Sequence, residues 1–375
     1  MNKKEITEVK KQFTPKHCTI TRICGCYVDA EKEKRTCFRD AFFSLPEEDA
    51  FKYFDIFKKT LSGSIGKNLV TMEFPLSTEA EGGTHEFLMR LRQSQLKEEE
   101  LLDEFYNRVI GAYDYPENYL ILLVHGAYDI PGRANDNTEM FDASDEVYEY
   151  LLCSICPVKL SKPGLSYNAQ DNCFQNRIRD WIVEMPQVGF LFPAFHDRST
   201  DLHSALYYSA NAADLHPDFT ELLLGLKTPL PAVSQREVFQ TLVEDTLGAD
   251  CGYETVMTIH EKLSEMIEEH KEDPAPVTLC QGDVKRLFFE SGVPKERLED
   301  FEQHYEETAG EDAVLVAANV VNPRRFEVKT PDVVIQVNPE RAQLVETRMI
   351  EGRRCLVIAV DENVQLNGVN LRSLE

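Results

Sequence analysis

The chain has 375 residues, of which 42% are hydrophobic, and its 40 basic and 65 acidic residues give a net charge of −25. This length favours two or three domains, and no stretch approaches the ~20 continuous apolar residues of a membrane span. So negative a field repels nucleic acid and anionic membranes unless a local patch reverses it. Ten cysteines are too sparse for a disulfide scaffold, and no apolar signal region follows the basic start, so we predict a cytosolic protein with reduced thiols.

The first hundred residues alternate between helical and strand patterns. Residues 1–12 predict a short helix, and residues 18–28 and 36–45 predict a hairpin, because two β-rich runs flank a charged segment. Residues 46–59 begin with proline and acids and repeat phenylalanine at helical spacing, which predicts an amphipathic helix. The periodicity across residues 87–110 predicts one or two further helices.

Apolar runs typical of buried strands follow. Residues 119–125 (YLILLVH) predict a central strand, and residues 147–158 predict a second buried segment. Residues 179–183 predict another strand, in which we interpret Trp181, the one tryptophan, as a core aromatic.

The second half changes character twice. Residues 216–224 predict a helix, and residues 225–233 (GLKTPLPAV) are typical of a linker. Helical patterns then run to about residue 312, with 17 acidic and 6 basic residues between positions 254 and 312. After residue 322, strand-like runs alternate with turns, including one at Glu351 and Gly352.

These patterns together predict an α+β protein. The expected parts are an N-terminal mixed α/β domain over residues 1–230, an acidic helical module over residues 231–320 and a small C-terminal antiparallel β-sheet over residues 321–375.

One stretch, residues 189–208 (GFLFPAFHDRSTDLHSALYY), concentrates side chains suited to chemistry. Three of them, Ser199, Thr200 and Asp201, often cap helices, and apolar residues follow at helical spacing. This predicts a loop that leads into a helix N-terminus, a place that suits an anion, and the histidines could also bind a metal or move a proton. The alternative is a capped helix with surface histidines. The candidate ligand-binding residues are His196, Asp197, Arg198, Ser199, Thr200, Asp201 and His203.

Two cysteine pairs form a candidate metal site. Cys153 and Cys156 have the spacing of half a zinc site, and Cys24 and Cys26 could supply the other half of a tetrahedron. Both pairs also lie in apolar strand-like runs, where reduced cysteine packs as a small core residue. Both interpretations remain open at this point.

Several stretches resemble an uncharacterised bacterial family that has only a domain-of-unknown-function designation, and the resemblance runs nearly end to end. It implies no activity, cofactor or catalytic residue. The order of parts is also similar to that of bacterial nucleoid-associated proteins, which implies nucleic-acid association. The stretches that resemble the family are RICGCYVD (22–29), MFDASDEVY (140–148), CSICP (153–157), FLFPAFHDRSTDLH (190–203) and VKTPDVVIQVNPER (328–341).

Three functions are compatible with these features. The leading hypothesis is a non-enzymatic cytosolic protein that acts through macromolecular contacts, with the acidic helices at 235–312 facing a protein partner. The second is binding or turnover of an anionic or phosphorylated small molecule at residues 196–203. The third is nucleic-acid binding, against which the net charge argues. Its groove would be lined by some of Arg90, Arg92, Arg177, Arg179, Arg324 and Arg325.

Overall fold

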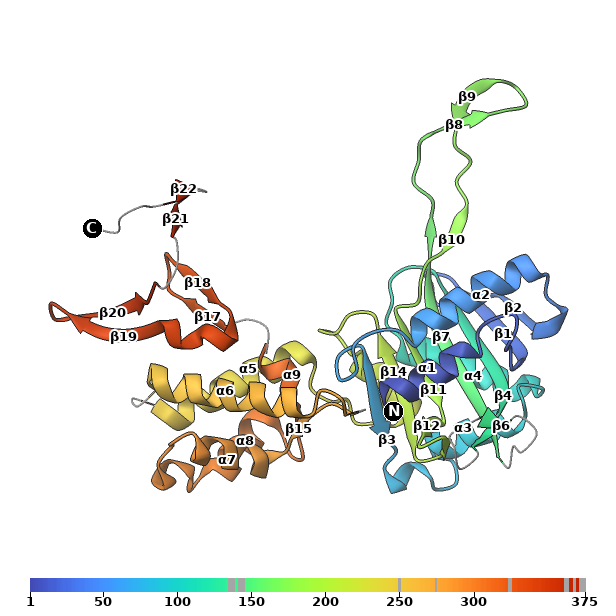
Figure 1. Ribbon diagram of the computed structural model, residues 1–375. Coiled ribbons are helices and arrows are strands. Elements are labelled where there is room, and N and C mark those ends of the chain that lie inside the picture. Colours follow the sequence, from blue (N-terminus) through green and yellow to red (C-terminus); the bar gives the residue numbers. More distant parts are fainter. Residues whose placement is uncertain are drawn as a thin grey trace. The chain divides into compact units, whose positions relative to one another are not determined.

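The computed structural model describes residues 1–133, 139–140, 146–248, 251–273, 275–322, 326–360, 364–366 and 369–370. The chain forms two compact units, Met1–Val233 and Ser234–Glu375, and each combines helices with antiparallel strands (Figure 1). The predicted α+β class is confirmed. The division of the second unit at residue 320 stays a prediction. Within the described part of the chain, no helix is long and apolar enough to cross a membrane.

One antiparallel sheet organises the first unit. Its strand order is β2-β1-β4-β7-β11-β14-β3, and β10 pairs with one end of β7. The hairpin expected from residues 18–45 and the inner strand expected at 119–125 are confirmed, because β1 pairs with β2 and β4 lies between β1 and β7. The strands are β1 (Ile20–Val28), β2 (Lys34–Ala41), β3 (Leu69–Glu73), β4 (Tyr119–Asp129), β7 (Val147–Leu160), β10 (Trp181–Val183), β11 (Val188–Phe192) and β14 (Ser204–Ser209).

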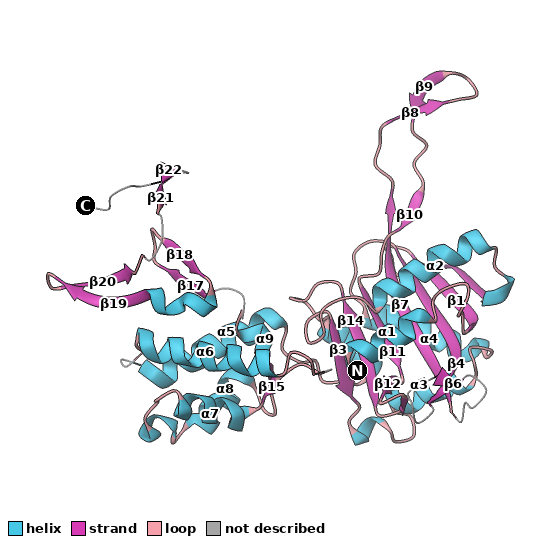
Figure 2. Cartoon of the chain, viewed as in Figure 1, coloured by secondary structure: helices cyan, strands magenta, loops and turns pink. Residues whose placement is uncertain are grey.

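Helices cover both faces of this sheet (Figure 2). One core contains Phe57 and Leu122, and the other contains Phe105 and Leu123. Successive residues of a strand point to opposite faces, so a strand covered on both sides is apolar throughout, which explains the unbroken run at 119–125. The first face carries α1 (Lys3–Lys11) and α2 (Glu47–Thr60), and the second carries α3 (Thr84–Gln93), α4 (Glu99–Ala112) and the π-helical segment η3 (Phe219–Leu224).

The second unit contains helices followed by hairpins. The strands expected after residue 322 are confirmed, but the described residues place them in separate two-stranded sheets. Glu351 and Gly352 form the expected turn, with φ of 51° and 75°. The helices are α5 (Ala232–Leu247), α6 (Tyr253–Glu269), α7 (Gln281–Glu290), α8 (Phe301–Ala309) and α9 (Ala317–Val320). The strands are β15 (Thr278–Leu279), β16 (Leu315–Val316), β17 (Phe326–Lys329), β18 (Val334–Val337), β19 (Val345–Ile350), β20 (Arg353–Ile358), β21 (Gln365–Leu366) and β22 (Val369–Asn370).

The prediction of a helix after Asp201 is wrong. Residues 204–209 form strand β14, which pairs with β11 and β3. Tyr207 lies in the core beside α4, whereas Leu206 and Tyr208 lie in the core beside α2. The spacing that resembled a helical period therefore comes from a short strand buried on both faces.

Candidate functional site

The stretch expected to bind a ligand forms a tight hairpin. Strand β12 (Ala194–His196) pairs with β13 (Ser199–Asp201), and Asp197 and Arg198 form the turn between them. Both turn residues have left-handed backbone, with φ of 48° and 60°, as type I′ hairpin turns require. Residues 196–203 therefore do not offer the free N–H groups of a helix N-terminus.

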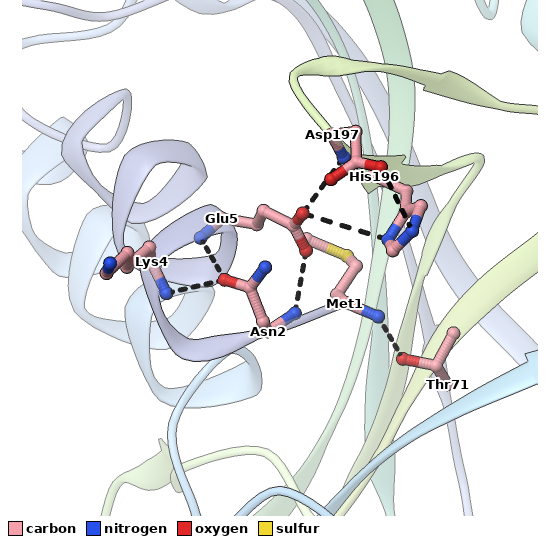
Figure 3. Close-up of polar contacts among 7 residues, drawn as sticks. All are labelled: Met1, Asn2, Lys4, Glu5, Thr71, His196 and Asp197. Atoms are coloured by element: carbon pink, nitrogen blue, oxygen red, sulfur yellow. Dashed lines mark hydrogen bonds and ion pairs between the residues drawn. The ribbon is translucent and has the colours of Figure 1, made fainter. Parts of the chain in front are cut away.

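Glu5 of helix α1 accepts a hydrogen bond from the turn (Figure 3). Its side chain is 6% exposed, and its Oε1 accepts the backbone N–H of Asp197 at 2.9 Å. Its Oε2 accepts the backbone N–H of Asn2 at 2.7 Å, which is part of the capping box of α1. The Nδ1 of His196 lies 3.7 Å from Glu5 Oε1. Glu5 therefore joins the start of α1 to the hairpin.

Two further carboxylates accept hydrogen bonds from the hairpin, and the backbone oxygen of Pro131 accepts one more from Arg198, at 2.8 Å. The guanidinium of Arg198 donates to Glu8 Oε1 at 2.7 Å. The hydroxyl of Ser199 and the backbone N–H of Thr200 donate to one oxygen of Glu146, at 3.0 and 3.1 Å. An incoming anion would have to displace carboxylates of the chain itself. The geometry indicates a structural clasp, which we define as the β12–β13 hairpin with Glu5, Glu8 and Glu146.

The two candidate histidines contact different partners. His203 Nδ1 lies 2.6 Å from Glu79 Oε1, whereas His196 lies beside α1. The ring of His203 stacks on His85, with centroids 6.4 Å apart. Among the residues with described placement, no group of three or more His, Cys, Asp or Glu side chains is arranged to hold a metal ion.

The two cysteine pairs lie on different strands of the sheet, and the second pair is divided between its two faces. Cys24 and Cys153 both pair with Leu123, so a whole strand separates them by roughly 10 Å. Cys156 lies in the opposite core from Cys24, Cys26 and Cys153. Burial raises the pKa of Cys24 to about 12 and also raises the pKa of the other three thiols. Since zinc binds thiolates, these cysteines are better suited to packing than to metal binding.

The four described arginines of the expected nucleic-acid groove do not lie together. Arg90 and Arg92 lie on α3 at one end of β7, where the guanidinium of Arg92 donates to the backbone oxygen of Glu149 at 2.9 Å. Arg177 and Arg179 lie beyond the other end of β7, and Arg324 and Arg325 lie outside the described residues.

A long two-stranded arm projects from the sheet of the first unit (Figure 1). It begins where β7 pairs with β10, at Val158 and Val183, and we call residues 158–183 the arm. Its tip is the hairpin of β8 (Leu165–Asn168) and β9 (Cys173–Asn176). Every residue from 173 to 183 is exposed, so the return half of the arm is open to solvent.

The tip of the arm is amphipathic. Residues opposite one another on antiparallel strands share a face, and the register pairs Tyr167 with Phe174 and Leu165 with Asn176. The three apolar side chains on this face, Leu165, Tyr167 and Phe174, are 74%, 55% and 75% exposed. The Tyr167 and Phe174 ring centroids lie 5.6 Å apart. The opposite face carries Ser166, Asn168, Cys173 and Gln175.

The base of the arm is apolar as well, and here the sequence interpretation is wrong. Trp181 is 57% exposed and is not a core aromatic. Its strand pairs only with residues 158–160, at the end of β7 beyond its pairing with β4, so the helical layers do not cover it. One signal could have revealed the tip: Leu165 and Tyr167 alternate with polar residues, and Phe174 follows across a polar turn.

Comparison with known proteins identifies a family whose description states no function. Residues 1–369 match the model of the family described as Domain of unknown function (DUF4317). The chain belongs to this family, as the resemblance predicted. No curated protein matches the chain.

Proposed function

We propose that the chain is a binding protein without catalysis of its own. It acts in the bacterial cytoplasm by contacting another protein through the arm. The observation that carries the proposal is the open apolar face of the tip, where Leu165, Tyr167 and Phe174 are each more than half exposed. Contiguous apolar surface of this kind marks interaction sites.

The physics of a two-stranded ribbon supports the proposal. An isolated hairpin is at best marginally stable in water, and a sheet with one apolar face normally packs that face on a core. Burial of one large apolar side chain contributes about 1.5–3 kcal/mol, so three such anchors contribute on the order of 5 kcal/mol. A protein surface that covers the tip would therefore stabilise both the contact and the ribbon.

Neighbouring positions on β9 provide a matched test. Phe174 lies on the apolar face of the tip, and Gln175 lies on the polar face. A photoreactive benzoylphenylalanine replaces one or the other in the full chain, and cells are irradiated. We expect a protein adduct, identified by mass spectrometry, from position 174 and little from position 175. Equal adducts from both positions, or none from either, would contradict the proposal.

The acidic helices of the second unit are a second candidate surface, for a basic protein partner. Helix α6 buries Ile259 and Leu263, and it leaves a row of carboxylates exposed. Crosslinking to a basic partner that ends when these carboxylates are neutralised would test this surface separately from the arm. The row consists of Glu261, Glu265, Glu268 and Glu269.

A further inference from the structure

A second exposed patch of the first unit complements the arm. It lies at the start of α2, where Phe43 is 71% exposed and Phe51 is 48% exposed. Glu47 and Glu48 precede Phe51 by one helical turn, so the three share one side of the helix. Both glutamates are exposed, and neither forms an ion pair with another described residue. We call Phe43, Glu47, Glu48 and Phe51 the α2 corner.

The corner is backed by a packed aromatic cluster. The ring of Phe51 meets Phe54 at a centroid distance of 6.5 Å, and Phe54 meets Phe42 at 5.3 Å. Both inner rings are buried. Phe51 therefore packs on a buried aromatic base, which lowers the entropy lost when a partner binds.

The arm has a net positive charge, whereas the α2 corner is negative. Residues 158–183 contain four basic and two acidic residues, whereas the whole chain has 40 basic and 65 acidic. The backbone N–H of Arg177 donates to the carbonyl of Gly164 at 2.8 Å, so Arg177 lies beside the foot of the tip. Lys162 is exposed on the outgoing half of the arm, and Arg177 belongs to the return half. The foot of the tip therefore carries two basic residues, one on each half of the arm.

The acidic face of α4 fits the arm less well. It forms a shallow hollow that includes Glu99 and Asp103. Cations of the same chain already approach both carboxylates, since Arg39 is 3.8 Å from Glu99 and Lys34 pairs with Asp103. Helix α4 contributes none of the large apolar side chains that are exposed among the described residues. It offers charge without an apolar contact.

We infer that the arm docks on the α2 corner of a second copy of this chain. The apolar face of the tip covers Phe43 and Phe51, while Arg177 and Lys162 approach Glu47 and Glu48. The inference rests on the proposed function and names its partner. Two arms exchanged about a two-fold axis give two equivalent contacts, which is the commonest symmetry of homo-oligomers. Because the complement is part of the chain, each copy supplies both halves of the interface.

A charge exchange in the purified full-length chain tests the inference by sedimentation velocity. The arm variant is Lys162→Glu with Arg177→Glu, and the corner variant is Glu47→Lys with Glu48→Lys. Like charges then face each other, so we expect the dimer dissociation constant to rise more than tenfold in either variant. When the two are combined in one chain, opposite charges face each other again and we expect dimerisation to return. A matched control at the start of another helix of the same unit, Glu98→Lys with Glu100→Lys on α4, should leave the dimer unchanged.

Two results would overturn the inference. One is a wild-type chain that stays monomeric at every concentration tested. The other is a combined variant that dimerises no better than either parent. In both cases the photocrosslink from position 174 separates the inference from the proposed function. An adduct with a different protein retains the proposed function and removes the second copy, whereas absence of any adduct removes both.

Discussion

The clasp and the tip of the arm are both short antiparallel hairpins, yet they use their side chains in opposite ways. In the clasp, the polar donors of Asp197, Arg198 and Thr200 meet carboxylates of the chain. In the tip, the apolar side chains of Tyr167 and Phe174 meet solvent over half or more of their surface. The sequence of the clasp contains side chains typical of a reactive site, and in the folded chain three carboxylates accept their hydrogen bonds. The tip has no such motif in its sequence, and its own unit leaves the apolar face uncovered.

In a chain without a catalytic motif, satisfied polar clusters and uncovered apolar surfaces have different implications for function. Polar residues on a surface loop need no explanation once their hydrogen bonds are accounted for. Exposed contiguous apolar surface does need one, because it costs free energy unless something covers it. By this criterion the clasp holds the fold together and the arm contacts a partner.

The largest effect expected is at the clasp. Replacement of Glu5 by Ala leaves the N–H groups of Asn2 and Asp197 without their acceptor and breaks the capping box of α1. Hydrogen bonds to charged groups contribute about 1.5–3 kcal/mol each, so we expect the free energy of unfolding to fall by about 3 kcal/mol. Urea denaturation measures the change. A fall below about 0.5 kcal/mol, the range of ordinary surface changes, would show that the clasp is not structural.

His125 differs from the polar groups of the clasp, because it is buried and one of its two ring nitrogens has no hydrogen-bond partner. His125 is fully buried in β4; its Nδ1 lies 2.7 Å from Thr21 Oγ1, and its Nε2 has no hydrogen-bond partner. Desolvation lowers the pKa of His125 from 6.5 to about 4. The neutral ring therefore stabilises the fold fully above pH 6.5, and this contribution is lost as the pH falls through 4.

The pH dependence should therefore differ between the wild type and a His125→Leu variant. Between pH 6.5 and 4, the wild type should lose up to about 3 kcal/mol of unfolding free energy that the variant does not lose. Denaturation at a series of pH values measures both slopes. A His17→Gln variant, which changes an exposed ring, should keep the wild-type slope. Parallel slopes for wild type and His125→Leu would exclude this role of His125.

The sequence predicted the elements whose patterns are local. The run at 119–125 is apolar because both faces of β4 are covered, and the phenylalanines of α2 repeat at helical spacing. The turn of the clasp was missed because Asp197 and Arg198 lack the Asn-Gly signature of a type I′ turn. The exposure of Trp181 was missed because residue type indicates burial only when a layer covers the strand.

The partners of the candidate residues were missed for a related reason. The carboxylates that bind its donors come from distant parts of the chain, with Glu5 separated from Asp197 by 192 residues and Glu8 from Arg198 by 190. No local pattern indicates such partners. A polar cluster in a sequence shows which hydrogen-bond donors a segment contains, and only the fold shows which acceptors bind them.

A smaller effect is expected from the ion pair of the clasp. Arg198 and Glu8 are 18% and 19% exposed, and they lie 2.7 Å apart. Arg198→Met keeps an unbranched apolar stem and removes the guanidinium. Glu8 and the backbone oxygen of Pro131 each lose one donor, while Tyr128 still donates to Glu8 at 3.0 Å. We expect a loss of about 1–2 kcal/mol in urea denaturation. A loss as large as that of Glu5→Ala would indicate that the ion pair, and not the capping box, anchors α1.

The smallest effect on intrinsic stability is expected at the tip, and here the dependence on concentration matters more than the size. Cross-strand pairs contribute about 0.2–1 kcal/mol, so Phe174→Ser should hardly change the unfolding temperature of a dilute sample. If the apolar face is a contact between copies, the unfolding temperature of the wild type rises with protein concentration, because association stabilises only the folded chain. Phe174→Ser should abolish that rise, while Gln175→Ser, on the opposite face, should keep it. A rise that persists in Phe174→Ser would place the self-association elsewhere on the chain. The exposed apolar face of the tip would then not distinguish a binding hairpin from a structural one such as the clasp.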